Sequence, residues 1–401
     1  MRALGGGRAG EMQITRFLRS RKVTSSEMAA AAGDRTRQVA GGRHILAIQD
    51  TTTLRDDGDQ ASIALHPTIA VDADDGALLG LVHAQVLHRR GGRKGLRKTV
   101  PFEDKESRRW LDGTQAAARL GAGEVTVVAD READIYETFA LRPPETQLLI
   151  RAMQDRRLAD GGLLFARAEE LVELGRVSVD LPAAPGRAAR TALLALRACP
   201  VVIARPKRPA PEAARLPATL AVWLVDAREV DPPRGSTGAH WRLLTTHAVP
   251  DLAAAQRLAG FYRRRWTIEQ LFRTMKTKGF DIEASRIEHA RAFENLAMAT
   301  LIAAIQVLQL VHERDGAAQR PLQDLFDLAQ AAALDRINAS LEGKTARQKN
   351  PHPPNSLAYA AWICARLGGW TGYYGKPGPI VMFDGLLRLK IMLQGWALRD
   401  V

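Results

Sequence analysis

The sequence is poor in cysteine, with Cys199 and Cys364 as the two cysteines of its 401 residues. Neither belongs to a CxxC pair, which excludes a four-cysteine zinc site and a disulfide framework and indicates a reducing compartment. The nine histidines show no clustering along the chain of the kind that binds a metal. The opening residues, MRALGGGRAG, lack the apolar segment of a secretory signal. There is no internal repeat.

Long apolar runs are also scarce. The most apolar helix candidate covers residues 296–311, contains Gln306 and Gln309, and is short for a membrane span. We therefore expect a buried helix there and no membrane partner.

Acidic residues are outnumbered: 57 Lys and Arg face 44 Asp and Glu, giving a net charge of +13. Such a balance favours a polyanionic partner, above all nucleic acid, although a generally basic protein from a GC-rich genome would show the same excess. Hydrophobic residues make up 46% of the chain, enough for a sizeable core and two to three domains.

Two short apolar segments, residues 44–50 and 125–130, each end on an acid and predict buried strands. Between them, residues 63–71 and 78–87 flank an Asp-Gly turn and predict a hairpin. Residues 131–140 are expected to be helical. The basic stretch 89–98 is interpreted either as a solvated loop or as a phosphate-contacting one.

A third acid, Glu269, lies in the basic stretch 251–278, which predicts one helix or two helices meeting at Gly260. At 100° per residue, one helix would gather its polar side chains within an arc of about 80°. A salt-bridged, solvated helix face is the alternative reading. The residues on this face are Tyr262, Arg265, Glu269, Arg273 and Lys276.

Three carboxylates brought together, Asp50, Asp130 and Glu269, would repel one another unless cations lie between them. Hard oxygen ligands suit Mg²⁺ or Mn²⁺, and two such ions can activate an attacking oxygen and stabilise a leaving one. This pattern predicts phosphodiester chemistry.

The chain resembles the insertion-sequence-4 family of DDE transposases, near the transposon-five type, from about residue 12 to residue 306. Tyr262, Arg265, Glu269 and Lys276 match the family's Y-(2)-R-(3)-E-(6)-K signature, and Arg273 falls where close members carry a lysine. The other matching motifs are Asp50-Thr51-Thr52, Lys105-Glu106-Ser107 and Asp130-Arg131-Glu132-Ala133-Asp134.

The resemblance implies a role for each matching residue. Asp50, Asp130 and Glu269 would be catalytic and would hold two Mg²⁺ ions, for which Mn²⁺ can substitute. Trp241 would stack on a flipped base, with a core residue as the alternative, and Glu132 and Asp134 would orient or cap a helix. The side chains expected to contact DNA are Tyr262, Arg265, Arg273, Lys276, Trp241, Arg151 and Arg131.

The fold expected from the motif order and the resemblance is α/β. Residues 44–145 and 246–300 would form a ribonuclease-H-like catalytic core, interrupted by a β-rich insertion over 146–245. Residues 1–43 would be the remnant of an N-terminal helical DNA-binding region, and 301–401 a helical region that serves dimerisation. Family members ordinarily carry several tens of additional residues before the stretch resembling residues 14–18.

The function that the resemblance implies is cut-and-paste transposition in a bacterial cytoplasm, at the nucleoid, by a homodimer that joins two transposon ends and a target DNA. A hairpin intermediate is part of this expectation. Two rivals stay open: a truncated, non-catalytic or inhibitory derivative that binds DNA, and a ribonuclease-H-like nuclease acting on branched DNA or hybrids.

Overall fold

The computed structural model describes residues 7–56, 61–90, 100–182, 188–207, 215–235, 237–277 and 279–397. Most of the basic stretch 89–98 lies outside these residues. Two compact units emerge from the described chain. We call Ala40–Ile69 with Leu87–Ile268 the sheet unit, and Met1–Val39 with Ala70–Val86 and Glu269–Val401 the helical unit.

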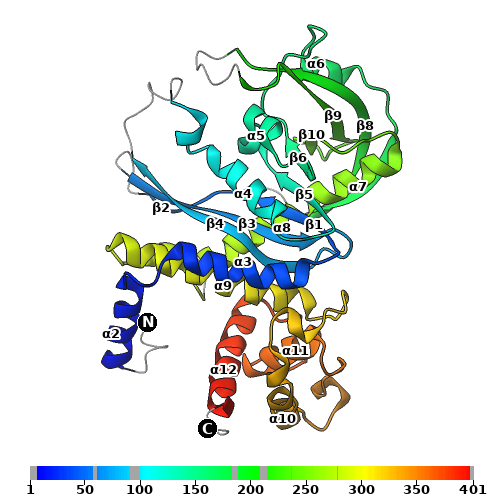
Figure 1. The fold of residues 1–401 in the computed structure, drawn as a ribbon. Coiled ribbons are helices and arrows are strands. Elements are labelled where there is room, and N and C mark those ends of the chain that lie inside the picture. The colour runs from blue at the N-terminus through cyan, green and yellow to red at the C-terminus, as the bar shows by residue number, and fades with distance from the viewer. Residues whose placement is uncertain are drawn as a thin grey trace. The chain divides into compact units, whose positions relative to one another are not determined.

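A large mixed sheet dominates the sheet unit (Figure 1). Its strand order is β2-β3-β1-β5-β6-β10-β9-β8-β7, and β4 pairs with β3. The strands are β1 (His44–Gln49), β2 (Thr52–Asp56), β3 (Ala61–Asp72), β4 (Leu78–Arg90), β5 (Glu124–Ala129), β6 (Thr146–Arg151), β7 (Gly175–Leu181), β8 (Arg190–Ala204), β9 (Thr219–Glu229) and β10 (His240–Thr245).

The centre of the sheet is parallel. β1 pairs with β5 in the register His44 to Glu124 and Gln49 to Ala129, and β5 pairs in parallel with β6. Five of the six residues are buried in β1 and in β5, as expected for strands covered on both faces. The β3–β4 hairpin turns at Gly76, whose φ of 80° suits glycine at this Asp-Gly reversal. Residues Ala70–Val86 of this hairpin belong to the helical unit. The expected strands and hairpin are confirmed.

Helix α4 (Arg108–Ala118) packs on β1, β5 and β6. The close approach depends on Gly113, where a Cβ would lie 2.5 Å from both Gln49 Oε1 and Thr68 Oγ1. Helix α7 (Leu252–Arg263) packs against β5, β7 and β8. Shorter helical elements of this unit are η2 (Phe102–Asp104), η3 (Arg131–Ala133), α5 (Tyr136–Leu141) and α6 (Leu164–Glu169).

The expected single helix over residues 251–278 is wrong, and so is a junction at Gly260. Helix α7 ends at Arg263 and α8 (Trp266–Lys276) begins three residues later. Between them the backbone tightens: the amides of Arg265 and Ile268 each bond a carbonyl three residues earlier. The helix expected over residues 131–140 is likewise divided into η3 and α5.

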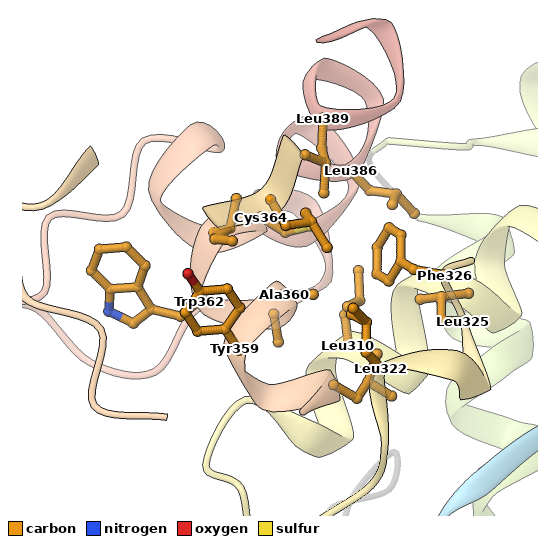
Figure 2. Close-up of a cluster of buried hydrophobic side chains, with 14 of the residues drawn as sticks. Leu310, Leu322, Leu325, Phe326, Tyr359, Ala360, Trp362, Cys364, Leu386 and Leu389 are labelled. Atoms are coloured by element: carbon orange, nitrogen blue, oxygen red, sulfur yellow. The ribbon is translucent and has the colours of Figure 1, made fainter. Parts of the chain in front are cut away.

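The helical unit has a core of its own. Its elements are α2 (Arg8–Arg19), α3 (Ser25–Ala40), α8 from Glu269 onward, η5 (Ile282–Ala284), α9 (Ala290–Glu313), η6 (Leu322–Asp324), η7 (Leu328–Gln330), α10 (Ala331–Leu341), η8 (Ala346–Gln348), α11 (Leu357–Leu367) and α12 (Pro379–Ala397). Figure 2 shows Leu310, Phe326, Ala360 and Leu386 meeting in this core. A Cβ at Gly385 would overlap the Cys364 carbonyl, so glycine lets α12 lie directly on α11.

Helix α9 includes the apolar segment expected to be buried. By length and composition it is long and apolar enough to cross a membrane, but 61% of its most apolar window is buried inside the structure. Its polar residues bond within the helical unit: Asn295 donates to the carbonyls of Leu18 and Val23, and Gln309 donates to that of Leu79. These contacts are those of a core helix.

Candidate functional site

Asp50 and Asp130 directly follow the paired strands β1 and β5. The parallel register places Gln49 beside Ala129, so the two aspartates leave the sheet at the same edge. Each carboxylate accepts a 2.8 Å hydrogen bond from the amide of the next residue, Thr51 or Arg131. The two acids are therefore held in the same local conformation, with side chains 25% and 31% exposed.

The guanidinium of Arg265 contacts both carboxylates. Its Nη1 lies 3.1 Å from Asp50 Oδ2 and its Nη2 lies 3.6 Å from Asp130 Oδ2. The Arg265 side chain is only 7% exposed, so water screens these attractions weakly. Arg265 occupies the tightened turn between α7 and α8, and from this turn its guanidinium reaches the acids. Tyr262 lies three residues earlier, in the last turn of α7.

Tyr262 and Arg151 complete the surroundings of Asp130. The Tyr262 hydroxyl donates to Asp130 Oδ1 at 3.1 Å, and Arg151 Nη1 lies 3.8 Å from the same oxygen. Burial, together with the negative charge of Asp130, raises the pKa of Tyr262 to about 12. Tyr262 is therefore a neutral hydrogen-bond donor at ordinary pH.

Glu269, Arg273 and Lys276 lie on α8 within the helical unit. Glu269 is partly buried in the first turn of that helix, and Arg273 is exposed. Lys276 Nζ lies 2.8 Å from Glu283 Oε1. The roles expected of these three side chains, as metal ligand and DNA contacts, stay predictions.

The remaining expected DNA contacts differ in exposure. Arg131 is exposed, whereas Arg151 is partly buried and donates to the His240 carbonyl at 2.8 Å. Trp241 on β10 is 5% exposed, and its ring packs edge-on against Tyr262 with centroids 5.1 Å apart. This position favours the core reading of Trp241, and its stacking on a base stays a prediction.

Arg109 is a residue that sequence reasoning missed. Its buried guanidinium donates from Nε to Thr51 Oγ1 at 3.2 Å and from Nη2 to Glu132 Oε2 at 2.9 Å. It thereby joins the loops that follow the two aspartates. Burial lowers the pKa of Arg109, while Glu106 and Glu132 act in the opposite direction. The sequence offers Arg108 and Arg109 side by side, and only the packing of α4 shows which one is buried.

The Asp134 carboxylate binds the segment that follows β6. It accepts from the amides of Met153 and Gln154 and from Arg156 Nε at 2.9 Å, and neither ionic side chain is more than 3% exposed. Of the two alternatives expected for Asp134, orientation or capping of a helix, capping of α5 does not apply, because both carboxylate oxygens bond the segment after β6 and the N-cap residue of α5 is Ile135. The expectation of an orienting role agrees with these bonds.

The expectation that the histidines do not cluster is also wrong. His44, Glu124 and His247 each offer one ligand atom, and these atoms lie within 4.8 Å of one another. The chain separates His44 from His247 by about half its length, so no spacing along the sequence signals this group. Folding brings the two rings together because β1, β5 and the segment after β10 converge.

In a comparison with known protein families, residues 38–305 match the model of the transposase DDE domain. The chain belongs to this family. Family membership supports a transposase function and implies DNA as the partner. Transposases of this family generally use divalent metal ions. The paired carboxylates fit such an ion, because Asp50 and Asp130 supply hard anionic oxygens that already converge on one cationic group.

Proposed function

We propose that the chain is a cut-and-paste transposase of the insertion-sequence-4 type, similar to the transposon-five enzyme. The observation that carries the proposal is the convergence of Asp50 and Asp130 on Arg265 at the ends of two parallel strands. In this proposal residues 44–145 and 246–300 are a ribonuclease-H-like core, 146–245 an insertion and 301–401 a dimerisation region.

Asp50, Asp130 and Glu269 would hold two Mg²⁺ ions, or Mn²⁺ in their place. Such ions, when bound, lower the pKa of an attacking water or 3′-hydroxyl and stabilise the leaving oxygen. Arg265 balances the charge of the two aspartates, and the Tyr262 hydroxyl fixes the orientation of Asp130. Arg131, Arg151, Arg273 and Lys276 would bind phosphates of the DNA backbone, which positions the scissile bond.

The proposed reaction begins when water attacks the phosphorus at a transposon end, so that a new P–O bond forms and the 3′-oxygen leaves with a proton. The freed 3′-hydroxyl then attacks a phosphorus of the opposite strand and displaces the 3′-oxygen of the flanking DNA, which leaves with the proton, so that a hairpin closes. A second water reopens the hairpin by attacking the same phosphorus and displacing the 3′-oxygen of the transposon end. Each 3′-end finally attacks a phosphorus of the target DNA and displaces a 3′-oxygen of the target. In this proposal a homodimer holds the two transposon ends, and the reaction takes place at the bacterial nucleoid.

A test is cleavage of a linear duplex that carries the inverted repeat flanking the gene, with Mg²⁺ or Mn²⁺. The proposal expects metal-dependent cutting at the end that Glu269→Ala abolishes. Glu288→Ala, an exposed acid of the same unit, is the matched control and should cut normally. Cutting that survives Glu269→Ala would overturn the assignment of the third carboxylate.

The alternative, a non-catalytic or inhibitory derivative, predicts a different pair of results. The wild-type chain would bind DNA without cutting it, and a footprint would show little protection of the inverted repeat. Cutting of branched DNA or RNA–DNA hybrids with no preference for the repeat would instead favour a nuclease of ribonuclease-H type.

A further inference from the structure

A second polar cluster lies at the opposite end of the strand pair that carries Asp50 and Asp130. His44 opens β1 and Glu124 opens β5, and the two are paired in register. Six residue steps of about 3.3 Å each lead from each of them to the aspartate that follows the same strand, a distance of roughly 20 Å. The cluster therefore belongs to a different site from the acids at the carboxyl end.

The third member, His247, arrives from the segment after β10. Thr246 anchors this segment, because its hydroxyl accepts from the Leu148 amide at 2.9 Å and its own amide donates to the Leu148 carbonyl at 3.1 Å. His247 is 7% exposed and its amide donates to Thr245 Oγ1. The backbone that leads into His247 is thus fixed to β6.

Thr126 fixes the orientation of both rings. Its hydroxyl lies 2.9 Å from His44 Nε2 and 2.8 Å from His247 Nε2. The other ring nitrogens approach one carboxylate: His44 Nδ1 lies 3.3 Å from Glu124 Oε2, and His247 Nδ1 lies 3.9 Å from Glu124 Oε1. A hydroxyl oxygen accepts two hydrogen bonds, so both rings can carry their proton on Nε2 and leave Nδ1 as a ligand.

We propose that His44, Glu124 and His247 form a binding site for Zn²⁺, with water as the fourth ligand. Two imidazole nitrogens and one carboxylate oxygen are the donors of open tetrahedral zinc sites. Zinc–nitrogen bonds of about 2.0 Å in a tetrahedron place ligand atoms roughly 3.3 Å apart. His44 Nδ1 and His247 Nδ1 lie 3.3 and 3.9 Å from different oxygens of Glu124, and the three ligand atoms lie within 4.8 Å of one another. Side-chain adjustments of up to about 1.5 Å therefore complete the geometry.

Charge and access set the strength of binding. The Glu124 side chain is 44% exposed, which gives an ion a path to the site, and Thr126 supplies the hydrogen bonds that zinc-binding histidines require. Burial, then Arg257 and His44, lower the pKa of His247 to about 4, so its ring is neutral at pH 7. Arg257 also opposes a divalent cation, and we therefore expect micromolar rather than nanomolar affinity.

Binding would join three segments of the sheet unit: the start of β1, the start of β5 and the chain that leaves β10. Where His44 donates Nδ1–H to Glu124, zinc binding at Nδ1 requires the tautomer with the proton on Nε2, and this Nε2–H then donates a hydrogen bond to the Thr126 oxygen. No proton leaves a neutral ring. An ion bound only by the folded chain stabilises it by mass action.

The test uses the full chain carrying Asp50→Asn and Asp130→Asn, which removes the acids of the family's metal site. After chelation, equilibrium dialysis against Zn²⁺ should give one ion per chain, and Co²⁺ should show the visible absorption bands of tetrahedral coordination. Adding Glu124→Gln should weaken binding at least tenfold. Glu145→Gln, an exposed acid of the same unit, is the control and should leave binding unchanged.

Two results would overturn the proposal: no Zn²⁺ uptake at micromolar concentration, or uptake that Glu124→Gln leaves unchanged. Thermal unfolding of the zinc-free variants separates misfolding from lost ligation, because Glu124 is exposed and its amide analogue keeps the same shape. A second variant, His44→Gln, should lose the cobalt bands as well.

Discussion

The two ends of the β1–β5 strand pair carry different chemistry on one scaffold. At the carboxyl end, Asp50 and Asp130 offer oxygens to a guanidinium. At the amino end, His44 and His247 offer nitrogens around the carboxylate of Glu124. The same parallel register aligns both groups, so the backbone alone does not decide which ion each end prefers. Donor chemistry does: oxygens suit Mg²⁺ or Mn²⁺, and imidazoles suit Zn²⁺.

The largest effect is expected from Asp130→Asn, which keeps the shape of the side chain and removes its charge. If Asp130 holds the metal ion as proposed, we expect end cleavage to fall by at least about 10³-fold, because loss of such a ligand removes several kcal/mol of transition-state stabilisation. Initial rates on the inverted-repeat duplex measure the fall. Asp180→Asn, an exposed acid on β7, is the matched control.

The same variant also separates the two ends. Zinc uptake by Asp130→Asn should equal that of the wild-type chain at the amino-end site. A joint loss of cleavage and of the tetrahedral cobalt bands would contradict the independence of the two clusters.

The next effect concerns Arg265, whose charge the two aspartates share. Arg265→Met should lower the free energy of unfolding by about 3 kcal/mol, because it removes the guanidinium that contacts both partly buried carboxylates. Mn²⁺ should restore more stability to this variant than to the wild type. Urea unfolding at several Mn²⁺ concentrations measures both, with the exposed Arg263→Met as control. Equal metal response in all three chains would refute this reasoning.

Sequence patterning predicted the carboxyl end because its signals are local. A buried apolar run that ends on an acid identifies Asp50 and Asp130 without knowledge of the fold. Breaks in helices were predicted poorly: residues 257–276 have helical periodicity throughout, and only the tightened turn at Arg265 separates α7 from α8. Residues whose role depends on long-range packing were missed. Arg109 and the pair His44 and His247 are defined by partners far along the chain, which no periodicity encodes.

A smaller effect is expected from Thr126→Val, which preserves shape but removes the hydroxyl that both rings contact. Zinc affinity should fall ten- to a hundredfold, the usual consequence of losing a hydrogen-bond partner of metal-binding histidines. End cleavage should change little, since Thr126 lies four residues before Asp130. Dialysis with Zn²⁺ measures the first quantity, and Thr191→Val, exposed on β8, is the control. Unchanged affinity would mean that Thr126 does not orient the rings.

The smallest expected effect on stability is that of replacing His312 in the helical unit. This variant tests the consequence of burying a histidine that is not part of the proposed zinc site. Burial, then Arg314, lower the pKa of His312 to about 4. A base whose folded pKa is lowered binds fewer protons than the unfolded chain, so its contribution to stability is present above about pH 6.5 and is lost as pH falls toward 4. The full shift corresponds to about 3 kcal/mol, which partial exposure of the ring reduces to about 1–2 kcal/mol.

His312→Gln should therefore lose less stability than the wild type between pH 7 and pH 4, as measured by urea unfolding at each pH. Zn²⁺ should not alter this difference. Zinc could instead suppress the acid-induced loss of stability in His312→Gln and fail to suppress it in Glu124→Gln. That result would place the acid sensitivity at the amino-end cluster.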